Sequence, residues 1–324
     1  GFGVTGKGKK VLVEYAQPNT HKEFHIGHIR SSLYGQSVVN LVRANGYETI
    51  AASYIGDIGA HVAKAIWGFK KFFGDATIAK ADRARTLGEA YTQATQYADE
   101  HPEVKEEFAD VQRKLEAEEE PWFSLWRETR EWSLESFRAI FKELGVVPDV
   151  WYYESDVEQP VKELVKKMLT DGIAKKSQGA TIVDLEDEKL GVFLALKTDG
   201  SSLYATKDLA LAYRKEKDYA PDRQIFVIDV RQSLYMKQLF ATLKRMQFQP
   251  ELVHLGFEVV TLPDGAMSSR KGNIVRYEDL RDTLVEKITE ETKIRHADWK
   301  PKKVAQNATA IAMAGMKFMM LRQD

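Results

Sequence analysis

Residues 11–30 read VLVEYAQPNTHKEFHIGHIR, and this stretch predicts a strand, a turn and the start of a helix. The run VLVEY has the near-continuous apolar and β-branched side chains of a buried strand. A helical pattern then runs from residue 26 to Asn45-Gly46, a pair that commonly ends helices. YETIAASYI (47–55) predicts a second strand. A strand–helix–strand unit of this kind favours a parallel sheet with a right-handed crossover.

The chain beyond residue 60 first predicts helices and then returns to alternating elements. Residues 60–145 are strongly charged and follow a helical period, and the apolar positions of their last helix are expected to be core. These positions are Trp122, Trp126, Phe137, Ile140, Phe141 and Leu144. A hairpin is predicted within 176–197, followed by a helix at 206–217, a strand at 224–229, a helix at 232–247 and a strand at 252–257. We therefore predict an α/β protein whose parallel-sheet nucleotide-binding domain is interrupted by a mostly helical insertion.

The predicted elements divide the chain into four parts. Residues 1–60 form the first half of the nucleotide-binding domain, and 61–195 form a connective insertion that is mostly helical with a short hairpin. Residues 196–295 form the second half, and 296–324 begin a C-terminal helical region that stops at Asp324 inside a predicted helix. The chain is therefore expected to be a fragment.

Composition limits the kinds of function that remain. The formal net charge of the 324 residues is −1, so any site for a polyanion must be a local patch. The chain has no cysteine, which excludes disulfides and thiolate metal sites. No apolar run reaches the roughly 18 residues of a membrane-spanning helix, so we expect a cytoplasmic protein without a membrane partner.

Two histidines, His25 and His28, stand where the first strand gives way to a helix. Ligands of open α/β sheets bind at the carboxyl edge of the strands, and helix N-termini favour phosphate. Two imidazole N–H groups could bind successive phosphate oxygens there, and Gly27 would let a flat base approach the backbone. From this pattern alone, capping or core histidines are an equally good interpretation.

A second phosphate-binding element is predicted late in the chain. AMSSRKGN (266–273) follows the last strand and combines hydroxyl donors with the mobile cations Arg270 and Lys271. Such a loop could follow the charge that builds on a leaving pyrophosphate. Taken alone it is more often a solvated turn, but the two elements together in one α/β chain are much less expected by chance.

The pair resembles the two signatures of class I aminoacyl-tRNA synthetases, the HIGH sequence and a degenerate KMSKS loop. VEYAQPNTHKEFHIGHIRSSLYG (13–35) is similar to the arginyl-tRNA synthetase signature, and YIGDIGAH (54–61) to that family's Gly-Asp-x-Gly element. TDGSSLYATKDLALA (198–212) and DVRQSLYMKQLF (229–240) resemble two further segments of the same family. The resemblance extends from about residue 11 to 320 and implies the Rossmann-like catalytic domain of class I synthetases.

The resemblance implies roles for individual residues of this chain. Ala266 and Ser269 stand where the class has two lysines, so Lys22 is the expected substitute cation. The implied catalytic residues are His25, His28, Lys22 and Lys271. The implied ATP-binding residues are His25, Gly27, His28, Met267, Ser268, Ser269, Arg270 and Lys271.

The implied amino-acid substrate is arginine, whose planar cation is best held by a fork of acceptors. By resemblance Tyr204 and Asp208 hold the guanidinium, and Glu14, Gln232 and Asn19 fix the rest of the amino acid. Without the family context, a Tyr-x-x-x-Asp sequence is more often a helix cap beside a core tyrosine.

The resemblance implies ATP-dependent formation of arginyl-adenylate and transfer of the arginyl group to tRNA(Arg). Mg²⁺ would arrive with ATP, so no dedicated metal site is expected, and the expected state is a monomer. Two alternatives are a nucleotidyltransferase that uses the His-x-Gly-His phosphate site without tRNA, and a folded binding remnant without catalysis.

Overall fold

The computed structural model describes residues 3–74, 76–198, 204–260 and 274–322, and the chain forms two compact units. The sheet unit comprises Gly1–Gln17, Gly35–Ile55 and Pro148–Val259. The helical unit comprises Pro18–Tyr34, Gly56–Val147 and Val260–Asp324. Helix α1 (Ile26–Ala44) begins in the helical unit and ends in the sheet unit.

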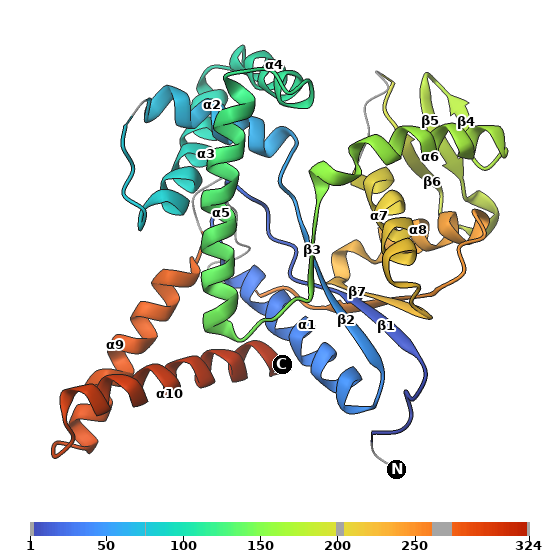
Figure 1. Cartoon of the computed structure of the whole chain (residues 1–324). Helices are drawn as coiled ribbons and strands as arrows, with labels where there is room; N and C mark the ends of the chain where they lie inside the picture. Colours follow the sequence, from blue (N-terminus) through green and yellow to red (C-terminus); the bar gives the residue numbers. More distant parts are fainter. Residues whose placement is uncertain (1–2, 75, 199–203, 261–273, 323–324) are drawn as a thin grey trace. The chain divides into compact units, whose positions relative to one another are not determined.

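The sheet unit contains a five-stranded sheet in which every pair of neighbours is parallel (Figure 1). Its order is β3-β2-β1-β7-β8. The strands are β1 (Lys10–Glu14), β2 (Glu48–Ile55), β3 (Val150–Tyr153), β7 (Arg223–Asp229) and β8 (Glu251–Phe257). The central strand β1 is buried from Val11 to Glu14, as its unbroken apolar run predicts.

The strand order reverses between β1 and β7, because chain order runs outward from β1 on one side and from β7 on the other. Ligands of open α/β sheets bind outside the carboxyl ends of the strands at such a reversal. Strand β1 ends at Glu14 and β7 ends at Asp229. These two ends therefore mark the expected ligand edge of the sheet unit.

The second half of α1 packs closely against β1. Gly35 allows this approach, since a Cβ atom there would lie 2.2 Å from the Cβ of Tyr15. The other helices of the sheet unit are α6 (Glu158–Thr170), α7 (Tyr204–Tyr219) and α8 (Ser233–Arg245). A small antiparallel sheet of β4 (Lys175–Ser177), β5 (Ala180–Asp184) and β6 (Val192–Leu196) belongs to the same unit.

The helical unit contains several long helices (Figure 1), and one of its hydrophobic cores includes the buried side chains of Trp67, Phe108 and Trp126. Its helices beyond α1 are α2 (Ala60–Phe72), α3 (Arg83–Glu100), α4 (Val104–Glu116), α5 (Trp122–Leu144), α9 (Tyr277–Arg295) and α10 (Pro301–Leu321). The core positions predicted for α5 are confirmed from Trp126 to Leu144, whereas Trp122 is only partly buried.

The sequence predicted most of these elements but not all of them. The strands at β1, β2, β7 and β8, the hairpin of β5 and β6, and helices α1, α7 and α8 are confirmed. Strands β3 and β4 and helix α6 were not predicted, and β3 lies inside the range 61–195 that was assigned to the insertion. In the described part of the chain, no helix has the length and apolar character needed to cross a membrane.

Candidate active site

The turn that carries His25 is fixed in the helical unit by the segment that follows the predicted second loop. The N–H of Ile26 donates to the carbonyl of Val275, and the N–H of Tyr277 donates to the carbonyl of Phe24, both at 2.9 Å. His25 and Arg276 form an isolated antiparallel bridge between these two hydrogen bonds. The first signature and the residues directly after the second are therefore neighbours.

His25 and His28 form a stacked pair at the start of α1, with ring centres 3.9 Å apart. The N–H of Gly27 donates to Nδ1 of His25 at 3.1 Å, and the N–H of His25 donates to Nδ1 of His28 at 3.3 Å. Because both Nδ1 atoms accept, the proton of each neutral ring is assigned to Nε2. Each imidazole therefore offers one N–H donor away from the backbone.

Burial keeps both imidazoles neutral. Burial, together with the nearby Lys22 ammonium, lowers the pKa of His25 to about 4. Burial also lowers the pKa of His28 well below its usual value, with His25 and Lys22 adding to the effect. At pH 7 the pair supplies neutral, preoriented N–H donors, which suit oxyanions whose charge grows during a reaction.

Lys22, the expected substitute cation, belongs to the same part of the helical unit. Its Nζ lies 4.9 Å from the centre of the Tyr91 ring on α3. Its charge also acts on both His25 and His28. The predicted ATP-binding residues Met267, Ser268, Ser269, Arg270 and Lys271, together with Ala266, lie outside the described residues.

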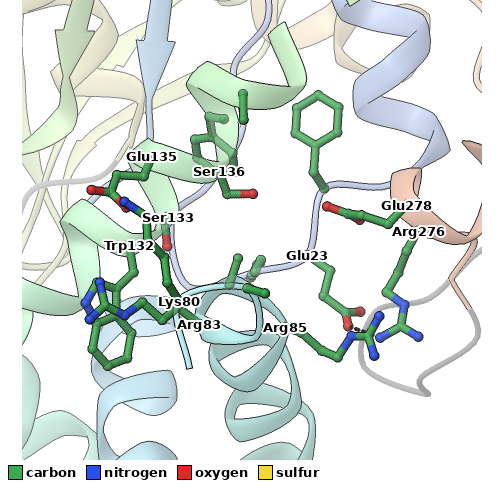
Figure 2. Close-up of a pocket in the computed structure, with 16 residues that line it drawn as sticks. Glu23, Lys80, Arg83, Arg85, Trp132, Ser133, Glu135, Ser136, Arg276 and Glu278 are labelled. Atoms are coloured by element: carbon green, nitrogen blue, oxygen red, sulfur yellow. Dashed lines mark hydrogen bonds and ion pairs between the residues drawn. The ribbon is translucent and has the colours of Figure 1, made fainter. Parts of the chain in front are cut away.

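The same turn borders a cavity of about 250 Å³ in the helical unit (Figure 2). Glu23 lines the cavity and forms an ion pair with Arg276, whose Nη1 lies 3.1 Å from Oε1 of Glu23. Ser133 and Trp132 line it from α5. Burial raises the pKa of Glu23, with Arg276 opposing the shift. The pair ties the turn to the start of α9.

In the sheet unit, Asp208 is a partly buried carboxylate among the predicted arginine-binding residues. It lies in the first turns of α7, and its Oδ2 accepts a 2.5 Å hydrogen bond from the Tyr235 hydroxyl on α8. Burial raises the pKa of Asp208 to about 7, and the neighbouring Glu14 contributes in the same direction. Such a carboxyl gains a proton readily when no cation compensates its charge.

Glu14, at the end of β1, is held differently from Asp208. Its Oε2 is bonded to the ammonium of Lys215, whose side chain is 0% exposed. Its Oε1 accepts a hydrogen bond from Gln17 Nε2 at 3.2 Å. The Lys215 ammonium also lies 4.4 Å from the centre of the Phe226 ring. The charge of Glu14 is therefore balanced inside the protein.

The other predicted arginine-binding residues are more open. Tyr204 is 59% exposed, with its ring centre 5.0 Å from that of Tyr235. Gln232 is exposed and directly precedes α8. Asn19 is partly buried and pairs with Gly56 in the helical unit. The structure thus places Glu14, Tyr204, Asp208 and Gln232 in one unit, and Asn19, Lys22, His25 and His28 in the other.

Sequence reasoning missed two residues that shape this site. Tyr235 lies in the segment quoted for Gln232, three positions further along, and it holds Asp208. Lys215 lies seven positions after Asp208, two turns along the same helix, which puts both on one face. That spacing was a usable signal, although a lysine on a helix is normally expected to be solvated.

Comparison with protein families gives one match over nearly the whole chain. The family model described as tRNA synthetases class I (R), catalytic domain, matches residues 3–324. The arginine–tRNA ligase of Bdellovibrio bacteriovorus is 37% identical over 327 residues, covering 98% of this chain and 56% of that protein. That of Clostridioides difficile is 35% identical, covering 88% of this chain and 50% of that protein. The chain thus spans about half the length of these curated relatives.

Solved structures support the same fold. The arginyl-tRNA synthetase of Thermus thermophilus superposes with a TM-score of 0.83 at 19% identity, covering 99% of this chain and 60% of that one. The enzyme of Plasmodium falciparum gives a TM-score of 0.78 at 19% identity, covering 97% of this chain and 52% of that one. The Rossmann-like fold predicted from the sequence is confirmed.

Proposed function

We propose that this chain, which belongs to the family of class I tRNA synthetase catalytic domains of the arginine type, activates L-arginine with ATP and transfers the arginyl group to tRNA(Arg). The family membership supplies the reaction class. The choice of arginine among amino acids needs support from the residues of this chain.

The observation that carries the choice of arginine is the partly buried carboxylate of Asp208, whose pKa is raised to about 7. Its charge has no ion-pair partner among the described residues, while the neighbouring Glu14 is balanced by Lys215. A partly buried carboxylate without an ion pair is stabilised by a guanidinium, which brings a permanent charge and several donors. We infer that Asp208 receives the substrate guanidinium, and that the exposed side chains of Tyr204 and Gln232 also contact the amino acid.

The chemical step would be the attack of an arginine carboxylate oxygen on the α-phosphorus of ATP. A new O–P bond forms, and the bond between the α-phosphorus and the bridging oxygen of pyrophosphate breaks. Nε2–H of His25 and of His28 would donate to phosphate oxygens, and Lys22 would neutralise charge on the departing pyrophosphate. Positioning and charge stabilisation account for most catalysis in such transfers.

The remaining assignments are part of the same proposal. MgATP is a substrate, with Mg²⁺ carried by the nucleotide, and Lys271 with the rest of the 266–273 loop would bind its phosphates. Asn19 would bind the backbone end of arginine, and tRNA(Arg) would accept the product. We also propose a cytoplasmic monomer, and the division of the chain at residues 60, 195 and 295.

The direct test is arginine-dependent exchange of pyrophosphate into ATP, measured with and without tRNA(Arg). We expect exchange with arginine but not with lysine, which lacks the planar fork, or with citrulline, which lacks the charge. Asp208→Asn should abolish most of the arginine dependence. Exchange that ignores the amino acid added would contradict the proposal.

A nucleotidyltransferase that works without tRNA is not favoured, because the family model extends over residues 3–324 and the relatives described above are arginine–tRNA ligases. A silent binding remnant would bind arginine without exchanging pyrophosphate. Calorimetric titration with arginine, run beside the exchange assay, separates that outcome from loss of folding.

A further inference from the structure

His21 is a buried histidine in the turn that carries His25, called the signature turn below. The mechanism proposed above gives His21 no role. Its side chain is 0% exposed, and its backbone has a φ of 60°, which is uncommon for a residue other than glycine. It stands directly before Lys22. All of its hydrogen-bond partners described below belong to the helical unit.

Helix α5 holds His21 at two points one helical turn apart. The backbone N–H of His21 donates to Oγ of Ser133 at 3.0 Å, and Nε2 of its ring lies 2.8 Å from Oγ1 of Thr129. On the other side, Nδ1 lies 2.9 Å from Oγ1 of Thr20. The side chain and the backbone of this one residue therefore connect the signature turn to α5.

The hydrogen-bond chain around His21 fixes its proton. The Thr129 hydroxyl donates to the carbonyl of Leu125 at 2.7 Å, so it accepts from Nε2–H of His21. The Thr20 hydroxyl lies 3.4 Å from the carbonyl of Gly56 but 2.9 Å from Nδ1 of His21, so Nδ1 is the better acceptor. Burial, followed by the nearby His61 and Arg130, lowers the pKa of His21 to about 3, which agrees with a neutral ring.

We propose that His21 is a positioning residue that sets the path of Lys22, by locking the left-handed backbone of the turn onto α5 through its neutral Nε2–H form. This inference rests on the proposed function, because it gives Lys22 a catalytic role. A strained φ persists only where the surroundings hold it, and here they do so with three hydrogen bonds. Lys22 follows directly, and its ammonium lies near both catalytic imidazoles.

A residue that only stabilised the fold would behave differently from one that acts through Lys22. Removing a fold-stabilising residue should lower activity whether or not Lys22 is present. Removing a residue that only positions Lys22 should cost nothing more once Lys22 is gone. A double-mutant cycle on adenylate formation therefore separates the two roles.

The cycle uses the parent chain, His21→Ala, Lys22→Ala and the double variant, with pyrophosphate release measured before steady state. We expect His21→Ala to slow release by roughly 10- to 100-fold, the scale that a misplaced catalytic group costs. ATP affinity should change far less, and in the Lys22→Ala background the second substitution should change the rate less than about twofold. A full loss in that background would overturn the proposal.

Three matched variants refine the result. His21→Gly removes the backbone strain but also the ring hydrogen bonds, so it should be as slow as His21→Ala. His21→Gln can restore a donor toward Thr129 and should recover part of the rate. Thr129→Val deletes a single hydrogen bond and remains informative if His21→Ala fails to fold. A parental rate for Thr129→Val or His21→Gly would overturn the proposal.

The proton assignment has a readout that needs no activity. Nitrogen NMR of labelled histidine in the parent chain should show His21 protonated at Nε2 only, with no titration between pH 8 and 5. A ring protonated at Nδ1, or one that titrates near 6.5, would overturn the locking mechanism. If the parent lacks arginine-dependent exchange, the proposed function fails, while the NMR result still decides the hydrogen-bond arrangement.

Discussion

Burial shifts the pKa values of the two groups of predicted site residues in opposite directions, and both shifts favour the neutral form. In the helical unit, burial lowers the pKa of His25 to about 4 and that of His28 as well, so the rings stay unprotonated at pH 7. In the sheet unit, burial raises the pKa of Asp208 to about 7, so this carboxyl is poised between its two forms. Glu14 follows a third way, because Lys215 balances its charge internally.

This difference indicates which of the two sites changes its protonation state when its ligand binds. The imidazoles accept backbone N–H groups at their Nδ1 atoms, so each Nε2–H donor is directed away from those groups before any ligand arrives. Among the described residues the Tyr235 hydroxyl donates to Asp208, and a bound guanidinium would shift this carboxyl fully to the charged form. We therefore expect the helical-unit site to be preset and the sheet-unit site to respond to arginine and to pH. Four experiments test this contrast.

The largest effect is expected from breaking the internally balanced pair. Lys215→Met leaves Glu14 buried without its cation, which typically costs about 3–5 kcal/mol. Urea unfolding should show this loss of stability, and the double variant Lys215→Met with Glu14→Gln should recover most of it. A single variant as stable as the parent would show that Lys215 is not needed to balance the charge of Glu14. If the stable double variant binds arginine poorly, Glu14 also contacts the substrate.

The next effect concerns Asp208 and the identity of the substrate. Asp208→Asn keeps the shape but removes the charge that would pair with a guanidinium, a loss typically worth about 2–5 kcal/mol. Calorimetry should show arginine binding weakened roughly 30-fold to several thousand-fold, with ATP binding nearly unchanged. Tyr235→Phe is the matched control, since it removes only the supporting hydroxyl and should have a smaller effect. Equal losses for arginine and ATP would mean that Asp208 is structural.

The preset site is tested by dividing the two functions of the His25 ring. His25→Asn can keep an acceptor for the N–H of Gly27 but loses the donor at the Nε2 position. His25→Gln can keep a donor near the Nε2 position. Loss of one preoriented donor to a developing oxyanion costs about 100- to 1000-fold in rate. We expect that loss for His25→Asn in adenylate formation and a smaller one for His25→Gln. The reverse order would show that His25 serves the turn and not the phosphate.

The fold could be predicted because its signals are local and repeated. Unbroken apolar runs and helical periods located β1, β2, β7, β8 and the long helices. Strand β3 has only four residues, VWYY, and only Tyr152 is buried, so its pattern is too short to separate from the flanking loop. The order of the sheet strands rests on contacts between distant segments, which a single sequence does not display.

The sequence motifs identified candidate site residues, but not their protonation states or their hydrogen-bond partners. His25, His28 and Asp208 were named from sequence, but their protonation depends on burial and on partners far along the chain. Tyr235 lies 27 residues from Asp208, and Thr129 lies 108 residues from His21. Lys215 and His21 look like ordinary polar residues until folding buries them.

The smallest effect expected is a pH dependence that belongs to one site only. Arginine needs the ionised form of Asp208, whose pKa lies at about 7, so the competent fraction rises about tenfold between pH 6 and pH 8. The apparent Kd for arginine should fall by about that factor over this range. Folding has the opposite sign, because a raised carboxyl pKa means that the native state binds the proton more tightly and loses stability as pH rises from about 4 to 7. His25 and His28 contribute nothing to the change, since their lowered pKa values keep both rings neutral throughout. Asp208→Asn should make the weak residual binding of arginine independent of pH in the same titration. A parent curve that is flat from pH 6 to 8, or a variant that keeps the slope of the parent, would remove the contrast between a preset site and a responsive one.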